Sequence, residues 1–157
     1  MNVRALHIIG WADSREAQDQ LPGLMRRLIL ATAEVESIFF PSGESVSRSG
    51  VDGMLNAKDA TPWVPGGKSV WEMGCDQSPG SKAERDYEGR RDEADAGTAF
   101  VFVTPRRWRG KQEWATSKHA EGLWRNVVAL DADDLEQWIE RAPGVGIWLG
   151  EKLGIAG

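Results

Sequence analysis

The amino-acid sequence predicts a mixed α/β domain, and three features support that prediction. Residues 21–35 and 78–95 show side-chain patterns that are typical of helices. Between them lie short apolar segments bounded by glycine and proline, which is the pattern of strands joined by turns. The continuous apolar run TAFVFVTP (98–105) is typical of a central strand that is buried on both faces. Helices that precede and follow strands in this way favour one α/β domain.

The first half of the chain is expected to form a helix followed by three strands. Residues 3–9 are compatible with a strand or with a turn that leads into the helix at 21–35. Pro22 is expected in the first turn of that helix, where a missing backbone N–H is tolerated. The apolar residues of the helix recur with a helical period at Leu21, Leu24, Leu28, Ala31 and Val35. Short strands are expected at 37–43, 50–56 and 68–74, with a proline- and glycine-rich loop at 58–67.

The second half of the chain is expected to add a helix, the central strand, a further strand and C-terminal helices. Ser78 and Ser81 are candidate N-caps for the helix at 78–95. A basic loop or short helix follows the central strand, and NVVAL (126–130) is the next strand. Asp131 is expected to cap a helix with an apolar inner face, and another short helix is expected at 144–154.

Composition and charge narrow the environment of the protein. The chain has 157 residues, of which 41% are apolar and 27% charged, and this fits one soluble domain spanning 1–157. It lacks the apolar run of ~20 residues that a membrane span needs, and its N-terminus lacks the pattern of a signal peptide. Cys75 is the only cysteine, which excludes an internal disulfide and favours a reducing cytoplasm. The net charge of −5 disfavours a general nucleic-acid binder, although a local basic patch can still bind phosphate.

Two carboxylates in the expected strands are candidates for a metal site. Asp52 lies between glycines in the second strand, and Glu72 lies in the middle of the apolar third strand. Consecutive strands of a meander are neighbours, so these side chains are expected close together. Carboxylates from adjacent strands form the hard oxygen site that Mg²⁺ or Mn²⁺ prefers. The residues also leave a second interpretation open, in which Asp52 is a turn residue, because Asp-Gly is a hairpin signal, and Glu72 faces water.

The order helix, three strands, helix, strand, with an aspartate in SGVDG and a glutamate in VWEMG, resembles the core of the PD-(D/E)xK nucleases. These are the restriction-endonuclease-like enzymes, and the Mrr-like branch is the most similar. The resemblance covers about residues 20–104. It implies a restriction-endonuclease-like core with an extra C-terminal strand and helices, and it implies catalytic and metal-binding roles for Asp52 and Glu72.

The sequence departs from this family pattern at one position. The signature lysine is expected two residues after Glu72, where this chain has Gly74. Some members of the superfamily carry the lysine on the following helix, which makes Lys82 the candidate catalytic lysine. Arg85 is the poorer alternative, because an arginine cannot be deprotonated and positions phosphate instead of activating water.

The resemblance also implies a metal-binding glutamate near the first helix, and Glu34 is preferred there over Glu36 and Glu44. A basic segment after the central strand, around Trp108, is the candidate for tracking a nucleic-acid backbone. Its candidate nucleic-acid-binding residues are Arg106, Arg107, Arg109 and Lys111.

The function implied by the resemblance is that of a metal-dependent DNA endonuclease with Mg²⁺ or Mn²⁺ as cofactor. Similar modules lie at the ends of larger bacterial antiviral defence proteins, which implies fused or associated sensor and ATPase domains, or further copies of the chain. The alternative is a non-catalytic recruitment or sensing module. Gly74, the negative net charge and the eight tryptophans favour that alternative, in which Glu72 and Lys82 form a structural ion pair.

Overall fold

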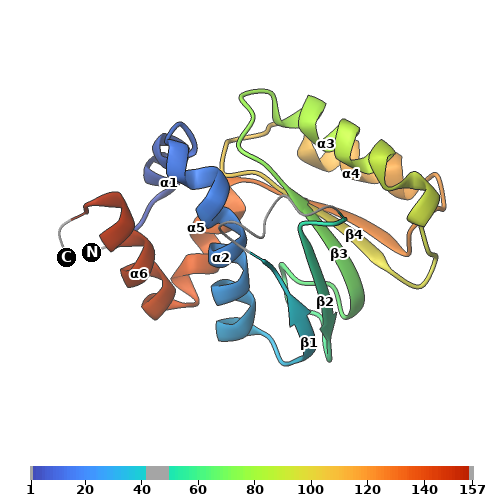
Figure 1. Ribbon diagram of the computed structural model, residues 1–157, viewed down its shortest axis with the longest axis horizontal. Coiled ribbons are helices and arrows are strands. Elements are labelled where there is room, and N and C mark those ends of the chain that lie inside the picture. Colours follow the sequence, from blue (N-terminus) through green and yellow to red (C-terminus); the bar gives the residue numbers. More distant parts are fainter. Residues whose placement is uncertain (1, 42–49, 156–157) are drawn as a thin grey trace.

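A five-stranded mixed sheet lies at the centre of the computed structural model, which describes residues 2–41 and 50–155 (Figure 1). The strands are β1 (Val35–Phe39), β2 (Gly53–Ala57), β3 (Gly67–Met73), β4 (Ala99–Val103) and β5 (Asn126–Leu130), in that order across the sheet. Strands β1 to β3 form an antiparallel meander, whereas β3, β4 and β5 run parallel. The structure confirms a mixed α/β fold in which a three-strand meander precedes a fully buried central strand, β4.

Helices cover both faces of this sheet (Figure 1). One face packs against α1, α2, α5 and α6, and the other packs against α3 and α4. The helix bounds are α1 (Ala5–Ala12), α2 (Arg15–Thr32), α3 (Pro79–Gly89), α4 (Lys111–His119), α5 (Ala132–Glu140) and α6 (Pro143–Leu153), with a 3-10 helix, η2 (Arg91–Glu93), after α3. Side chains alternate along β3, so Trp71 and Met73 enter the first core while Val70 packs against the second.

The N-terminal segment differs from the sequence prediction. Residues 3–9 suggest a strand or a turn, but the structure has helix α1 there. The helical period becomes visible only when the window extends to Trp11, because the buried residues of this helix are Ala5, Ile8, Trp11 and Ala12.

Helix α2 also begins earlier than the sequence predicts. The Ser14 side chain caps the helix by accepting a hydrogen bond from the backbone N–H of Ala17 at 3.2 Å. Pro22 therefore lies inside the helix and not in its first turn, at a cost of about 3 kcal/mol. Pro22 and its neighbour Leu21 are both buried, and the packing of this helix face against the sheet offsets that cost.

The eight tryptophans serve packing. All of them are buried or half-buried, and Trp63 stacks on the buried Trp138 with ring centroids 5.6 Å apart. None of the eight is fully exposed, so each ring could offer only part of its surface to a protein interface. Among the described residues, no helix combines the length and apolarity needed to cross a membrane.

Candidate metal centre

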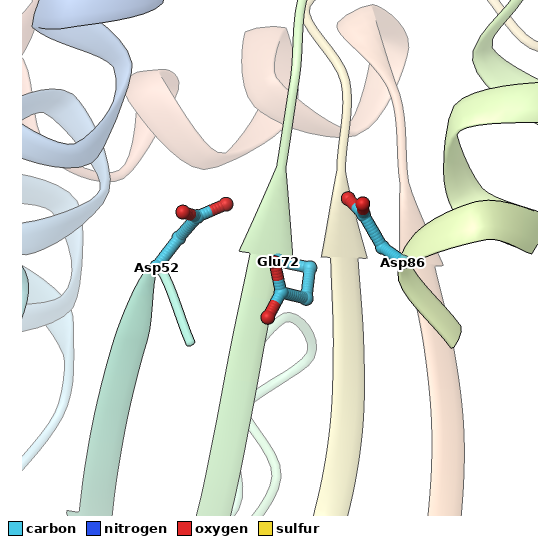
Figure 2. Close-up of side chains that lie close together, drawn as sticks. All are labelled: Asp52, Glu72 and Asp86. Atoms are coloured by element: carbon cyan, nitrogen blue, oxygen red, sulfur yellow. The ribbon is translucent and has the colours of Figure 1, made fainter. Parts of the chain in front are cut away.

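The register of the meander brings the two predicted carboxylates together. Gly53 of β2 pairs with Trp71 of β3, so Asp52 and Glu72 lie at the same end of adjacent strands. Asp86 of helix α3 completes the group from above the sheet (Figure 2). One carboxylate oxygen from each of the three residues lies within 4.8 Å of the others. The structure thus confirms that Asp52 and Glu72 are neighbours on one face, and it adds a third acid.

Gly50 and Gly53, on either side of Asp52, are each required by a different feature of the backbone. Gly50 has a φ of +84°, a conformation that costs other residues free energy. A Cβ on Gly53 would lie 2.4 Å from the ring of Phe40, so only glycine lets that ring pack against the strand. Phe40 in turn meets the buried Trp71 edge-on, with centroids 5.5 Å apart. The glycines therefore fix the backbone that presents Asp52.

Hydrogen bonds hold two of the acids in place. The backbone N–H of Met73 donates to Oδ2 of Asp52 at 2.9 Å. Nε of Arg90 donates to Oε2 of Glu72 at 2.8 Å, and the same guanidinium also donates to Glu93 and to the carbonyl of Gly50. Arg90 therefore links β3 to the segment just before Asp52.

Burial and mutual repulsion strain the acids electrostatically. The Glu72 side chain is 6% exposed, and burial, followed by the charges of Asp52 and Asp86, raises its pKa to about 8 despite the opposing effect of Arg90. Burial also raises the pKa of Asp86, while Lys82 lowers it. A carboxylate whose pKa lies near neutrality and which faces two further carboxylates is a candidate for a functional site.

Lys82, the candidate lysine from the sequence, lies between Gly74 and Asp86. Its methylene stem packs on Gly74, since a Cβ on that glycine would lie 2.5 Å from Cε of Lys82. Its Nζ donates to Oδ1 of Asp86 at 3.0 Å. The other oxygen of Asp86, Oδ2, is buried and has no hydrogen-bond partner among residues 2–41 and 50–155. A buried acceptor without a partner costs free energy, and a cation at the cluster would satisfy it.

Sequence reasoning missed Asp86 and Arg90, although a signal for both was present. Lys82, Asp86 and Arg90 follow one another at intervals of four residues. Residues four apart share one face of a helix. A face that alternates basic, acidic and basic groups beside a buried glutamate indicates a site, and it becomes visible once Lys82 is placed on the helix.

The predicted third ligand, Glu34, lies elsewhere. It precedes β1 at the end that pairs with Ala57, whereas Asp52 precedes the opposite end of β2. Its carboxylate is exposed and lies 3.9 Å from Lys58. Glu36 is also exposed, in β1, and Glu44 lies outside the described residues. The structure does not bring Glu34 to the cluster and offers Asp86 in its place.

Most of the basic segment is engaged in ion pairs. Arg106 donates to Asp13 at 2.8 Å and to the carbonyl of Cys75 at 2.7 Å, and its side chain is only 15% exposed. Arg107 pairs with Asp133, and Lys111 pairs with Asp131 and Asp134. Arg109 is exposed and forms no ion pair within the described part of the chain. Three of the four predicted nucleic-acid contacts thus have internal partners.

Cys75 follows Gly74 but shows no sign of chemistry. Burial raises the pKa of its thiol to about 11, so the thiol is protonated at neutral pH. A protonated thiol is a poor nucleophile, so nothing in the described residues points to a catalytic role for Cys75.

The three acids of the cluster are groups that could hold a metal ion. Three carboxylates supply hard oxygen donors of the kind that Mg²⁺ and Mn²⁺ prefer, and Lys82 and Arg90 are cations at its rim. The acidic triad Asp52, Glu72 and Asp86 can therefore hold a metal ion. The chain matches no protein-family model, no curated protein and no solved structure.

Proposed function

We propose that this protein is a metal-dependent DNA endonuclease with a restriction-endonuclease-like core. The observation that supports the proposal best is the convergence of Asp52, Glu72 and Asp86 beside Lys82, whose stem fills the space at Gly74. The order α2, β1, β2, β3, α3, β4 is also the order of elements that the resemblance to the PD-(D/E)xK nucleases requires.

In this proposal each residue has a defined task. Asp52 and Glu72 hold Mg²⁺ or Mn²⁺, and Asp86 either adds a ligand or orients Lys82. A divalent cation bound there supplies a water of lowered pKa and neutralises charge on a phosphate. The Lys82 ammonium stabilises the negative charge that develops on the phosphate or orients the attacking water. Arg90 holds Glu72 in position.

The second candidate function is non-catalytic, and it is supported by the ion pairs that the acids form within the protein. Glu72 pairs with Arg90 and Asp86 pairs with Lys82, so a non-catalytic recruitment or sensing module is the alternative. The Glu72–Lys82 pair expected for that alternative is not the one observed. The two functions differ in whether the cluster binds a divalent cation with functional consequence.

The experiment incubates circular single-stranded DNA and supercoiled plasmid with the protein in Mg²⁺ or Mn²⁺. The variant Asp52→Ala tests the site, and Glu34→Gln, at the far end of the same strands, is the matched control. The proposal expects cutting by the wild type and by Glu34→Gln, and none by Asp52→Ala. Equal cutting by wild type and Asp52→Ala would reject the assigned site. Absence of cutting by all three proteins, also at concentrations that favour oligomers, would favour the non-catalytic module.

The setting of this activity is proposed from the resemblance alone. Modules of this type act in bacterial antiviral defence as effectors of larger assemblies. We infer that DNA is the partner at the cluster, and that fused or associated sensor and ATPase domains, or further copies of the chain, control access to it.

A further inference from the structure

An apolar surface lies next to the acidic cluster on the same face of the sheet. The register pairs Phe39 of β1 with Met54 of β2, and Met54 with Val70 of β3. Because side chains alternate, Met54 shares a face with Asp52, and Val70 shares it with Glu72. Phe40, the next residue after Phe39, enters the core on the opposite face. The row Phe39–Met54–Val70 is hereafter called the apolar row.

The part of the apolar row that is not covered by α3 and α4 is exposed to solvent. Phe39 is 61% exposed and Met54 is 52% exposed, whereas Val70 packs against the core under α3 and α4. Figure 1 shows β1 and β2 extending beyond these two helices. The other large exposed apolar side chains in the described chain are Leu6, Leu30 and Ile147, on α1, α2 and α6. Phe39 and Met54 differ from these three in lying side by side on the face that carries the acidic cluster.

The apolar row is small for the apolar centre of a stable protein interface. The exposed parts of one phenylalanine and one methionine amount to roughly 200 Å². A specific protein interface buries about 800 Å² on each partner. One or two nucleobases, in contrast, present flat apolar faces that match a single aromatic ring.

The spacing along the sheet fits an extended nucleic-acid strand. Two residues along a strand span about 6.7 Å, so the apolar row lies about that far from the row of Asp52 and Glu72. A nucleotide whose base is not stacked on its neighbours can turn that base away from the phosphate and onto a surface beside it. A further two residues along, on the same face, lie Asn56 and the exposed Lys68. Lys68 forms no ion pair within the described chain and can meet a neighbouring phosphate.

We infer that the apolar row is a base-stacking subsite that selects single-stranded DNA for the adjacent metal centre. The inference rests on the proposed function for the identity of the ligand. A nucleobase stacks on Phe39 and Met54 while the scissile phosphate lies at Asp52, Glu72 and Asp86. A base inside a duplex is already stacked on its neighbours and cannot lie flat on Phe39, so intact duplex is the poorer substrate.

The test separates binding from cutting. Fluorescence anisotropy measures binding of a labelled DNA oligonucleotide, alone or annealed to its complement, in Ca²⁺, which takes the same oxygen ligands. Cutting of both DNAs is measured in Mn²⁺. The variants are Phe39→Ala and Phe39→Trp, with Leu6→Ala as a matched control on α1, where an apolar side chain is 72% exposed.

The expected result is a single-strand preference that depends on an aromatic ring at position 39. Phe39→Ala should weaken binding and slow cutting of the single strand about tenfold, since stacking on an aromatic side chain contributes about that much per base. Phe39→Trp and Leu6→Ala should match the wild type. The shift in thermal midpoint caused by Mn²⁺ should be the same in all four proteins, because the metal ligands are intact.

The remaining outcomes assign failure to one proposal or the other. If the protein cuts DNA but Phe39→Ala behaves as wild type, or if duplex is preferred, the stacking subsite is rejected and the nuclease stands. If the single strand binds and Phe39→Ala weakens that binding, while no protein cuts, the hydrolysis is rejected and the subsite stands. If neither DNA binds, or if Phe39→Ala only dissolves a dimer of the chain, the subsite is rejected.

Discussion

The methylene stem of Lys82 lies against Gly74, two residues beyond Glu72 on the same strand end. A Cβ at position 74 would lie 2.5 Å from Cε of Lys82 and 3.2 Å from its Cγ. The space that a lysine at position 74 would occupy is thus filled by a lysine that comes from helix α3. The absence of a side chain at position 74 is therefore what allows the Lys82 side chain to occupy this space.

This relationship predicts an exchange experiment. Lys82→Ala should lower the rate of DNA cutting by roughly 10²–10³-fold, because a charge that stabilises the transition state is lost. Gly74→Lys alone should also lower the rate, since its stem collides with that of Lys82. The double variant Gly74→Lys/Lys82→Ala opens the space and should recover part of the activity, because Gly74 has no positive φ that would forbid a side chain. The measurement is the cutting rate of each variant, with thermal unfolding as the control for folding. A double variant no faster than Lys82→Ala would show that position 74 is not equivalent to the end of the Lys82 side chain.

The raised pKa of Glu72 predicts how stability depends on pH. The folded pKa is about 8, above the ordinary value of 4.5 for an unfolded chain. Below pH 4.5 the carboxyl is protonated in both states, and between 4.5 and 8 the unfolded chain ionises while the folded chain retains its proton. The free energy of unfolding should therefore fall over this window, by at most about 4 kcal/mol between pH 5 and 8. Glu72→Gln should lack that decline, so its melting midpoint should overtake that of the wild type as pH rises.

Comparison of the two melting curves against pH, without divalent cation, tests this point. If Glu72 acts as an ionised partner of Arg90, as in the non-catalytic alternative, Glu72→Gln should be less stable than the wild type between pH 5 and 8, and the two curves should stay parallel over that range. Metal affinity should show the opposite pH dependence to apo stability, since a cation must displace the proton. It should rise up to pH 8 and then level off.

The sequence could predict most of the sheet because its signals are local. NVVAL (126–130) is a short apolar run with clear ends, and it coincides with β5. The apolar run around β4 likewise places that strand in the interior. The sequence of the basic segment after β4 is compatible with a loop or a short helix, and in the structure α4 begins only at Lys111. Helix α1 was missed because a short apolar window does not distinguish a strand from a buried helix.

Two of the three acids in the cluster can be predicted from local sequence signals, and the third cannot. Asp52 and Glu72 stand out because glycine neighbours and an apolar strand are unusual places for a carboxylate. Asp86 lies in a helix rich in charged residues, SKAERDYEG, where an acid attracts no attention. Only the packing of α3 on the sheet turns Asp86 inward and Glu84 toward Trp114 and Lys118. Such a choice among helix faces is tertiary information.

Divalent cation should stabilise the protein, and two acids give matched tests. At a concentration a hundredfold above the dissociation constant, Mg²⁺ or Mn²⁺ should add about 2.7 kcal/mol of stability, which moves the melting midpoint by roughly 5–10 °C. Asp86→Asn should reduce this shift, because it removes a carboxylate from the triad. Glu34→Gln should keep the full shift, because Glu34 lies at the other end of the strands. A midpoint unaffected by cation in the wild type, or a shift lost in Glu34→Gln and kept in Asp86→Asn, would contradict the assignment of ligands.

The basic segment predicts a separation between stability and nucleic-acid binding. Arg106 is largely buried and donates to Asp13 and to the carbonyls of Cys75 and Ala12, so it joins the turn after α1 to the segment after β3. Arg106→Ala should lower the free energy of unfolding by about 2–3 kcal/mol, because those acceptors lose a charged donor. Arg109→Ala should change stability by less than about 0.5 kcal/mol, since its side chain is exposed.

For DNA binding we expect the opposite ranking: Arg109→Ala should have the larger effect and Arg106→Ala the smaller. If Arg109 contacts phosphate, Arg109→Ala should weaken binding and reduce the slope of log affinity against log salt by about one. Arg107→Ala is the control for removing a surface arginine that is engaged in an ion pair. Its exposed pair with Asp133 contributes about 0–1 kcal/mol, so this variant should change stability little. Chemical denaturation and salt titrations of DNA binding supply both quantities. If Arg106→Ala were as stable as the wild type and bound DNA more weakly, Arg106 would belong to the DNA-binding surface, and its contacts with Asp13 and Cys75 would be secondary.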